Sequence, residues 1–326
     1  MVRVVLRAAA AATMVVCALA PLGVVAQTWP TKPVKIVVPF PPGGSVDPLA
    51  RVLGARLANS LGQSFIVENK TGASGSIGTA FVARSAPDGY TYVFVFDNHA
   101  VNPALIPNLP YDTVNDLAPV MLVGTAPMAI VTNVAKPYRN FGDVIRAAKA
   151  KPEAPSIGSV GNGSLGHLAM ILLQQAGGFK VTHVPYKGGG PMMADVMGSQ
   201  IDLGIASVAA LAANVKGGKL RALAVTGDKR SGVMPNVPTL AERGFTGFSA
   251  YAWWGILAPA GTPKPIIDKF HAELAKVLGQ PDLRKQLTET LGMDLQVSSP
   301  EALQKFVAGE MDRWGKVVRS NNVKAD

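Results

Sequence analysis

Two glycine-rich turns are the segments of this chain best suited to hold a small anion. The first, Phe40-Pro41-Pro42-Gly43-Gly44-Ser45, follows a β-branched run; its prolines stop a strand and its glycines permit positive φ. Asp47-Pro48 then has the residue types of a helix N-cap and first helical position. Such a turn points backbone N–H groups and the positive end of a helix at one spot, which favours a carboxylate. A tight connection without any ligand fits the same residues.

The second turn, Gly161-Asn162-Gly163-Ser164, leads into a predicted helix with Ser164 as its cap. With Gly166 it matches the dinucleotide-binding fingerprint, which also requires an acidic residue about 20 positions further on. Residues 181–186 contain none, so we interpret this turn as a second anion cradle. Lys187 precedes three glycines rather than following them, which excludes a P-loop; it can offer charge to an anion or be simply an exposed lysine.

Residues for covalent or metal-assisted catalysis are sparse. Ser164 and His167 stand one helical turn apart, a spacing more typical of capping and packing than of a nucleophile with its base. The four histidines, His99, His167, His183 and His271, lack the spacing of a metal pair. The sequence therefore favours binding without turnover. The alternative is an exported hydrolase or isomerase acting on a small carboxylate through Ser164, His167 and Asp97.

Alternating strands and helices must position these turns. The pattern predicts strands over 34–38, 65–67, 91–96, 129–131, 156–160, 181–184, 201–205 and 220–225, with helices between most of them. Alternation with short glycine connections is typical of parallel sheets, whose ligands lie beyond the carboxyl ends of the strands. This places Asp97-Asn98-His99, which follow the third strand, beside the first turn.

The end of the chain is expected to return to the first sheet. A strand over 251–258 precedes helices that start at Thr262-Pro263 and Ser299-Pro300. Trp253 and Trp254 on that strand are interpreted as core and hinge packing. Two crossings between domains would create a hinge and a cleft, with domain 1 made of 27–125 plus 250–326 and domain 2 of 126–249.

Composition and the N-terminus indicate an exported protein. The chain has 326 residues, a formal net charge of +10 and 48% apolar residues, which is enough for two domains with cores. Arg3, Arg7 and the apolar run to residue 26 predict a cleaved signal peptide over 1–26, rather than the membrane anchor that the length of the run would also allow. Cys17, the one cysteine, lies in that segment, so the mature chain would have no disulfide. Dispersed lysines and arginines argue against nucleic-acid binding.

Ordered motifs along the chain resemble a known family. They are Trp29-Pro30, VPFPPGGSVD at 38–47, VENKTGASGSIG at 67–78, APDGYT at 86–91, GNGSLGHLA at 161–169, HVPYKGGGP at 183–191, GKLRALAVT at 218–226 and GILAPAGTP at 255–263. Together they resemble the Bug-type solute receptors of tripartite tricarboxylate transporters. The resemblance implies an α/β fold, the two-domain type II periplasmic binding protein or Venus flytrap. Each domain would be a mainly parallel sheet flanked by helices, with a hinge between them.

The resemblance also implies a function. Such a protein is no enzyme and needs no cofactor or metal; it binds a small di-, tri-, amino- or aromatic carboxylate in the periplasm and delivers it to the large and small subunits of a membrane permease. We expect it to be a monomer. The signal peptide, and the lack of a helix-turn-helix segment before the first strand, argue against the effector-binding half of a transcriptional regulator, which shares this broad architecture.

The resemblance assigns the carboxylate to the first turn, partly through bridging waters, and closes the second domain over it with the loops around Ser164, His167 and Tyr186. Two places depart from many relatives: Asp97-Asn98-His99 replaces small hydroxyl residues, and Ile205-Ala206-Ser207 lacks an acidic or amide residue. Asp97 is expected to contact a hydrogen-bond donor on the ligand, such as an amine, and to make a simple dianion a less suitable ligand than in relatives. The predicted ligand-binding residues are Phe40, Pro41, Pro42, Gly43, Gly44, Ser45, Asp47, Asp97, Asn98, His99, Val160, Gly161, Asn162, Ser164, His167, Tyr186, Lys187, Ala206 and Ser207.

Overall fold

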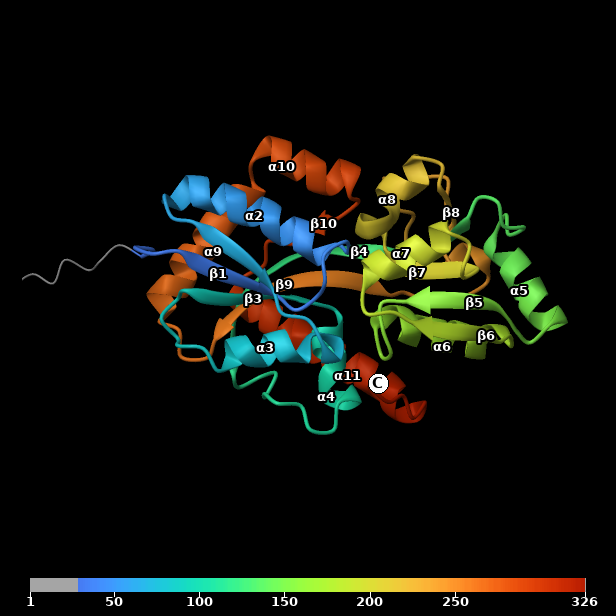
Figure 1. The fold of residues 1–326 in the computed structure, drawn as a ribbon, viewed down its shortest axis with the longest axis horizontal. Coiled ribbons are helices and arrows are strands. Elements are labelled where there is room, and N and C mark those ends of the chain that lie inside the picture. The colour runs from blue at the N-terminus through green and yellow to red at the C-terminus, as the bar shows by residue number, and fades with distance from the viewer. Residues whose placement is uncertain (1–28, 326) are drawn as a thin grey trace, which may run out of the picture. The chain divides into compact units, whose positions relative to one another are not determined.

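The computed structural model describes residues 29–325, so the predicted signal peptide lies outside the described residues. The chain divides into two units, residues 1–31 and 32–326, and every helix and strand described below belongs to the second unit (Figure 1). Within the described part of the chain, no helix combines the length and the apolar character needed to cross a bilayer.

Ten strands form one mixed sheet. They are β1 (Val34–Val38), β2 (Phe65–Asn69), β3 (Thr91–Phe96), β4 (Leu117–Asn133), β5 (Glu153–Ser159), β6 (Val181–Pro185), β7 (Leu203–Ser207), β8 (Leu220–Val225), β9 (Tyr251–Pro259) and β10 (Asp294–Leu295). Their order is β2-β1-β3-β9-β4-β7-β5-β6, with β8 and β10 also paired to β4. The sets β2-β1-β3 and β6-β5-β7 are parallel, as the alternation predicted, and β9 and β4 join them antiparallel.

Strand β4 links two half-sheets. Its first part, Leu117 to Pro127, pairs with β9, and the part from Met128 onward pairs with β7 and β8. We call β2, β1, β3, β9, β10 and the first part of β4 the first half-sheet, and the remaining strands with the rest of β4 the second. Each half-sheet with its helices is called a lobe. The sequence predicted only residues 129–131 as a strand here, because prolines usually mark the end of a strand. The boundaries of the two predicted domains stay a prediction.

Helices cover both faces of the first half-sheet (Figure 1). They are α2 (Val46–Leu61), α3 (Ser76–Ala83), α4 (Asn98–Leu105), α9 (Lys264–Leu278), α10 (Pro281–Lys285) and α11 (Pro300–Ser320), with short turns η2 (Ala73–Gly75) and η4 (Gln286–Thr290). On one face, the Phe270 ring of α9 lies 4.2 Å from the Tyr92 ring, centroid to centroid. On the other, Phe306 of α11 meets Trp253 edge-on at 5.5 Å. The closing helices thus return to the first sheet, as predicted.

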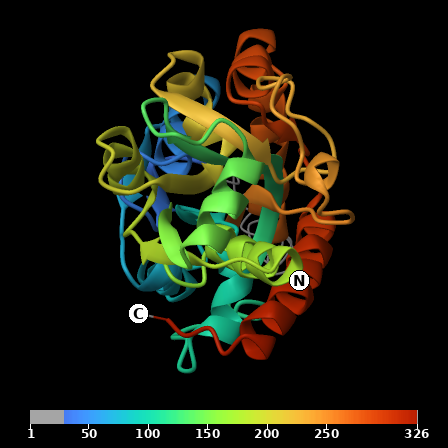
Figure 2. The same ribbon diagram turned by 90° about the vertical axis from the view of Figure 1, so that its right-hand side faces the viewer.

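The second half-sheet carries α5 (Phe141–Ala150), α6 (Leu165–Gly177), α7 (Gly189–Met197), α8 (Val208–Lys216) and the turn η3 (Ala241–Arg243). In Figure 2, turned by 90°, α5 lies foremost in green and α11 runs along one side in red. Met192 of α7 and Leu211 of α8 are fully buried in one core with strands of this half-sheet. The predicted start of α5 is confirmed, because Asn140 and Asp143 form a capping box.

The segment after β3 forms a helix, α4, for which the sequence analysis gave no prediction. Asp97 is the N-cap of α4, and the helix carries His99 into the core of the first lobe, where it is 2% exposed. Its ring is parallel to that of Tyr111 at 6.1 Å and edge-on to Trp253 at 6.5 Å. Neither ring nitrogen has a hydrogen-bond partner among residues 29–325, and burial lowers the pKa of His99 to about 4.

Close packing at Gly78 gives the first prediction. A Cβ at Gly78, in α3, would lie 2.6 Å from the Lys70 carbonyl oxygen and 2.9 Å from Pro39 Cβ. We expect Gly78→Ala to lower the free energy of unfolding by about 1–3 kcal/mol, because backbone must move. Gly309 lies in the middle of α11, where an added Cβ would meet no described atom within 4 Å apart from the helix's own backbone. Gly309→Ala should therefore raise the free energy of unfolding by about 0.5–1 kcal/mol. Urea unfolding of the mature chain measures both, and a Gly78→Ala protein as stable as wild type would contradict the packing.

The buried His99 gives a second prediction. Its pKa of about 4 in the folded chain lies below the ordinary 6.5, so the unfolded chain takes up a proton first as the pH falls. Stability is therefore lost between pH 6.5 and 4, by up to about 3 kcal/mol. Urea unfolding of wild type and His99→Phe from pH 7 to 4.5 isolates this effect, since the other ionisable groups are shared. We expect wild type to lose more stability than His99→Phe as the pH falls. Parallel curves of unfolding free energy against pH for the two proteins would contradict a neutral His99.

Candidate ligand-binding site

The first glycine turn (residues 40–45) lies between β1 and α2 and is anchored on both sides. The Phe40 ring meets Phe96 edge-on at 6.0 Å, and Gly43 has a φ of +94°. Ser45 is the N-cap of α2, but its hydroxyl makes no capping bond and instead accepts a hydrogen bond from the Trp254 indole at 3.3 Å. The turn is therefore tied to β9, the strand that pairs with β4.

Asp47 does not cap α2, because the helix already begins at Val46. Its buried carboxylate accepts hydrogen bonds from Arg51 at 2.9 and 3.0 Å and from the Asn69 amide at 2.8 Å. The Asn69 amide also donates to the Phe40 carbonyl at 2.9 Å. Burial opposes ionisation of Asp47, but the bonds from Arg51 and Asn69 hold its pKa below the usual value. Asp47 thus stiffens the first glycine turn.

Arg51 and Asn69 are residues that sequence reasoning missed. The four-residue spacing of Asp47 and Arg51 on one helix face is a signal for this pair. The partnership with Asn69 carries no such signal, since it depends on the neighbouring strand β2.

A triple-glycine turn (residues 187–190) at the start of α7 touches the first glycine turn. A Cβ on Gly43 would lie 3.2 Å from Gly190 Cα, and one on Gly188 would lie 2.8 Å from Pro41 Cγ. Only backbone fits between the two lobes here. The neighbouring Lys187 side chain is exposed, which leaves both sequence interpretations of this residue open.

The Gly161 loop (residues 160–164) joins β5 to α6 with positive φ at Gly161 and Gly163. Ser164 caps α6 as predicted, accepting the His167 N–H at 3.4 Å, and its hydroxyl donates to Ser159 Oγ at 3.2 Å. His167 Nδ1 accepts the Gly163 N–H at 3.1 Å. A Cβ on Gly163 would lie 2.3 Å from Leu105 Cδ2, so this loop packs on α4 of the first lobe. Asn162 and Val160 are half-buried.

Asp97 lies where α4 meets α6. Burial, followed by the nearby charge of Glu310, raises the pKa of Asp97 well above its usual value, whereas the N–H groups of Asn98 and Leu165 favour its ionised form. Neither carboxylate oxygen makes a hydrogen bond of good geometry within the described chain. The adjacent Asn98 side chain donates to the Ser74 carbonyl. Of the three residues predicted beside the first turn, Asp97 alone therefore faces the second lobe.

The remaining predicted residues lie in the second lobe. Tyr186 donates its hydroxyl to Asp195 at 2.7 Å, and burial together with this carboxylate raises the pKa of Tyr186 to about 12. Ala206 is buried in β7. Ser207 caps α8 by accepting the Ala210 N–H at 3.4 Å. This hydroxyl thus places the first turn of α8 at the carboxyl end of β7.

A cavity of about 240 Å³ lies between the starts of α2 and α8. It is lined by Gly44, Ser45, Pro48, Leu49 and Val52 of the first lobe, Ala209 and Ala210 of α8, and Gln286, Leu287, Leu291 and Met293 from the segment around η4. Gly44 and Ser45 were predicted as ligand-binding residues, whereas the residues of α8 and of the segment around η4 were not. The α8 residues were missed because no helix was predicted there. Residues from the first turns of α2 and α8, at the positive ends of these helices, contribute to its lining.

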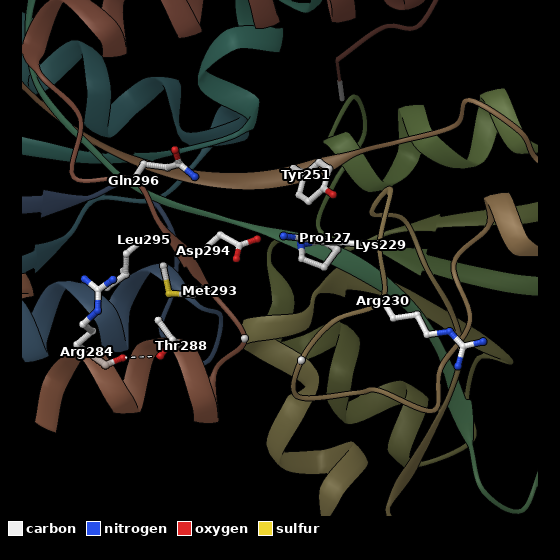
Figure 3. A pocket seen from close by; sticks show the side chains of 12 residues that line it. Pro127, Lys229, Arg230, Tyr251, Arg284, Thr288, Met293, Asp294, Leu295 and Gln296 are labelled. Atoms are coloured by element: carbon white, nitrogen blue, oxygen red, sulfur yellow. Dashed lines mark hydrogen bonds between the residues drawn. The ribbon is translucent and has the colours of Figure 1, made fainter. Parts of the chain in front are cut away.

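A larger cavity of about 680 Å³ opens near β9 and β10 (Figure 3). Its walls carry charges of both signs, among them Lys229, Arg284 and Asp294, and Arg230 at its edge pairs with Glu242 at 3.0 Å. None of the predicted ligand-binding residues of the described chain lines it. It shares Met293 with the smaller cavity, so the segment that contains Met293 separates the two.

The geometry limits the chemistry available at these turns. Ser164, His167 and Asp97 do not form a catalytic triad, since His167 Nδ1 is occupied by the Gly163 N–H and Ser164 donates to Ser159. Among residues 29–325, no cluster of three or more histidine, cysteine or acidic side chains is placed to hold a metal ion. What the arrangement does offer is helix ends and backbone N–H groups, which suit an anion.

Comparison with known proteins connects this geometry to receptors. Residues 49–323 match the model of the tripartite tricarboxylate transporter family receptor. BugT of Bordetella pertussis is 37% identical over 92% of this chain and 92% of its own. An R. palustris protein solved with adipate has a TM-score of 0.87 at 34% identity, covering 91% of this chain and 99% of that one. MatC from Rhodopseudomonas palustris, solved with bound malate, has a TM-score of 0.83 at 32% identity, covering 89% and 100%.

These matches confirm the α/β fold with a mixed sheet and flanking helices that periplasmic binding proteins share. The matches to BugT and to the two solved proteins extend over nearly the whole described chain, and the family model covers the Gly161 loop. The chain belongs to the TctC family of tripartite tricarboxylate transporter receptors, which includes the Bug proteins.

Proposed function

We propose that this protein captures a small organic carboxylate between its two lobes and delivers it unchanged to a tripartite tricarboxylate-type permease. The observation that carries the proposal is the 240 Å³ cavity between the starts of α2 and α8. Each helix end contributes about 0.3–1 kcal/mol to binding a negative charge, and up to about 2 kcal/mol when partly buried. Two solved relatives hold adipate and malate, which are acids of this size class.

Closure of the lobes is the second part of the proposal. The first glycine turn and the triple-glycine turn approach to backbone contact, since a Cβ on Gly43 would lie 3.2 Å from Gly190 Cα. A carboxylate bound between α2 and α8 touches both lobes and therefore stabilises the closed arrangement over an open one. The closed form would then be the shape that the permease recognises.

Export and delivery follow from the family and from the N-terminal sequence. Residues 1–26 have the features of a cleaved signal peptide, which would place the mature chain in the periplasm. The family takes its name from a three-part transporter, so we propose a large and a small permease subunit as partners and a monomeric receptor. The role is binding without turnover, supported by the hydrogen bonds that occupy His167 Nδ1 and the Ser164 hydroxyl within the Gly161 loop.

Calorimetry of the mature chain tests the binding step. We expect at least one di-, tri-, amino- or aromatic carboxylate to bind with micromolar affinity, about −8 kcal/mol, since two helix ends and an enclosed site act together. NMR of the acid after long incubation should show it unaltered. Silent titrations of ligand-free protein against the whole panel would contradict the function, and a chemically changed acid would favour the hydrolase or isomerase.

The contact between the glycine turns tests closure. In Gly190→Leu the side chain would begin 3.1 Å from the Pro42 carbonyl oxygen and hold the lobes apart. We expect ligand affinity to fall at least about 10-fold, while ligand-free stability changes little, because the strain exists only in the closed form. Small-angle scattering with saturating ligand should show a larger radius of gyration than for wild type.

The matched control is Gly232→Leu, at a glycine of the second lobe whose added Cβ would meet no described atom within 4 Å. It should bind and close like wild type. If Gly190→Leu also kept wild-type affinity and radius, contact of the two turns would not be part of ligand capture.

A further inference from the structure

The Gly161 loop is supported by a histidine on the neighbouring strand. β5 and β6 run parallel and set His183 opposite Ile157, and His183 Nε2 lies 2.7 Å from the hydroxyl of Ser159. Ser159 is fully buried at the end of β5. Its hydroxyl donates to the Gly161 carbonyl at 2.9 Å and accepts the Gly161 N–H at 3.3 Å. His183 therefore reaches the backbone of the loop through one side chain.

A second link runs through a ring stack. The rings of His183 and His167 are parallel within 6°, with centroids 3.8 Å apart. His167 in turn accepts the Gly163 N–H. The stack therefore supports the His167 ring, and that ring supports Gly163. His183 is thus connected to both glycines with positive φ in this loop, to Gly161 through Ser159 and to Gly163 through His167.

The Ser159 hydroxyl is the centre of this network, with hydrogen bonds to the Gly161 backbone, Ser164 and His183. Ser159 has one hydroxyl hydrogen, and the Gly161 carbonyl can only accept it. His183 Nε2 shares a hydrogen bond with Ser159 Oγ in which the donor depends on the ring's tautomer, and His167 carries no proton on Nδ1 where it accepts the Gly163 N–H. Burial, with the neighbouring His167, lowers the pKa of His183 to about 4, in agreement with a neutral ring.

The loop that His183 supports is a contact surface between the lobes. Gly163 packs on Leu105 of α4, and the N–H of Leu165, the next residue after Ser164, faces Asp97. A loop of another shape would not fit the first lobe. We propose that His183 is a positioning residue of the ligand site, which holds the Gly161 loop in the shape that closes on the first lobe and makes no contact with the ligand. This inference rests on the proposed function.

Three histidine variants separate the two links. His183→Phe keeps a ring for stacking but loses the nitrogen that hydrogen-bonds Ser159, whereas His183→Gln keeps an amide that can donate or accept but loses the ring. His271→Gln is the matched control, because His271 lies in the first lobe and hydrogen-bonds the Ser298 carbonyl there, at 2.8 Å. We expect the Kd of the bound carboxylate, by calorimetry, to rise about 10-fold in His183→Phe, to be partly rescued in His183→Gln, and to stay unchanged in His271→Gln.

Ser159→Ala checks the path. If His183 acts through Ser159, the loss of affinity in the Ser159→Ala, His183→Phe double variant will be clearly smaller than the sum of the single losses. Additive losses, or His183 variants that stay within twofold of wild type, would overturn the inference.

A measurement without ligand keeps the inference separable from the proposed function. Amide hydrogen exchange of ligand-free protein should be at least about 10-fold faster at Gly163 in His183→Phe, with the amides of α5 unchanged. A wild-type protein that binds no carboxylate would refute the proposed function, yet faster exchange at Gly163 would still support the positioning of the loop. Unchanged exchange at Gly163 would overturn it, whatever the protein binds.

Discussion

The arrangement of the site depends on one contact between two stretches of backbone. Gly43 and Gly190 come so close that a Cβ on Gly43 would lie 3.2 Å from Gly190 Cα, and neither turn can carry a side chain into the gap. This approach sets how near the lobes come, and with it the volume left between the starts of α2 and α8. The Asp47, Arg51 and Asn69 network has its purpose here, because a turn packed this closely must be held in one shape.

The electrostatics of the cleft follow from how the chain treats its own acids. Asp47 lies in the first turn of α2, beside the positive helix end, but Arg51 neutralises its charge and the Asn69 amide hydrogen-bonds it from the side. Asp97 is enclosed between α4 and α6, with no hydrogen bond of good geometry in the described chain. Neither carboxylate lines the cavity between α2 and α8. The described acids therefore do not cancel the positive ends of α2 and α8 at this cavity, and an uncancelled positive end attracts an anion.

Local patterns in the sequence predicted the local features well. The β-branched run became β1, the Asn140 and Asp143 pair became a capping box, and Ser164 caps α6. The strand β4 was largely missed because Pro119 and Pro127 interrupt it; the structure accommodates a register shift next to Pro119, which no local rule anticipates. His99 was placed near the ligand because α4 was not foreseen, and this helix contains Pro103. The meeting of residues 40–45 with 187–190 is purely tertiary, so spacing along the chain could not reveal it.

The helix starts are not equivalent as anion sites, and this shapes what the receptor can hold. The start of α6 faces Asp97, a carboxyl of the chain itself, through the N–H of Leu165. The starts of α2 and α8 face empty volume instead. A ligand carboxylate placed between α2 and α8 meets two helix ends without competition, whereas a second carboxylate directed at α6 would approach Asp97. Like charges in a buried site oppose each other unless one takes up a proton, so the residue at position 97 bears directly on how many negative charges the guest can carry.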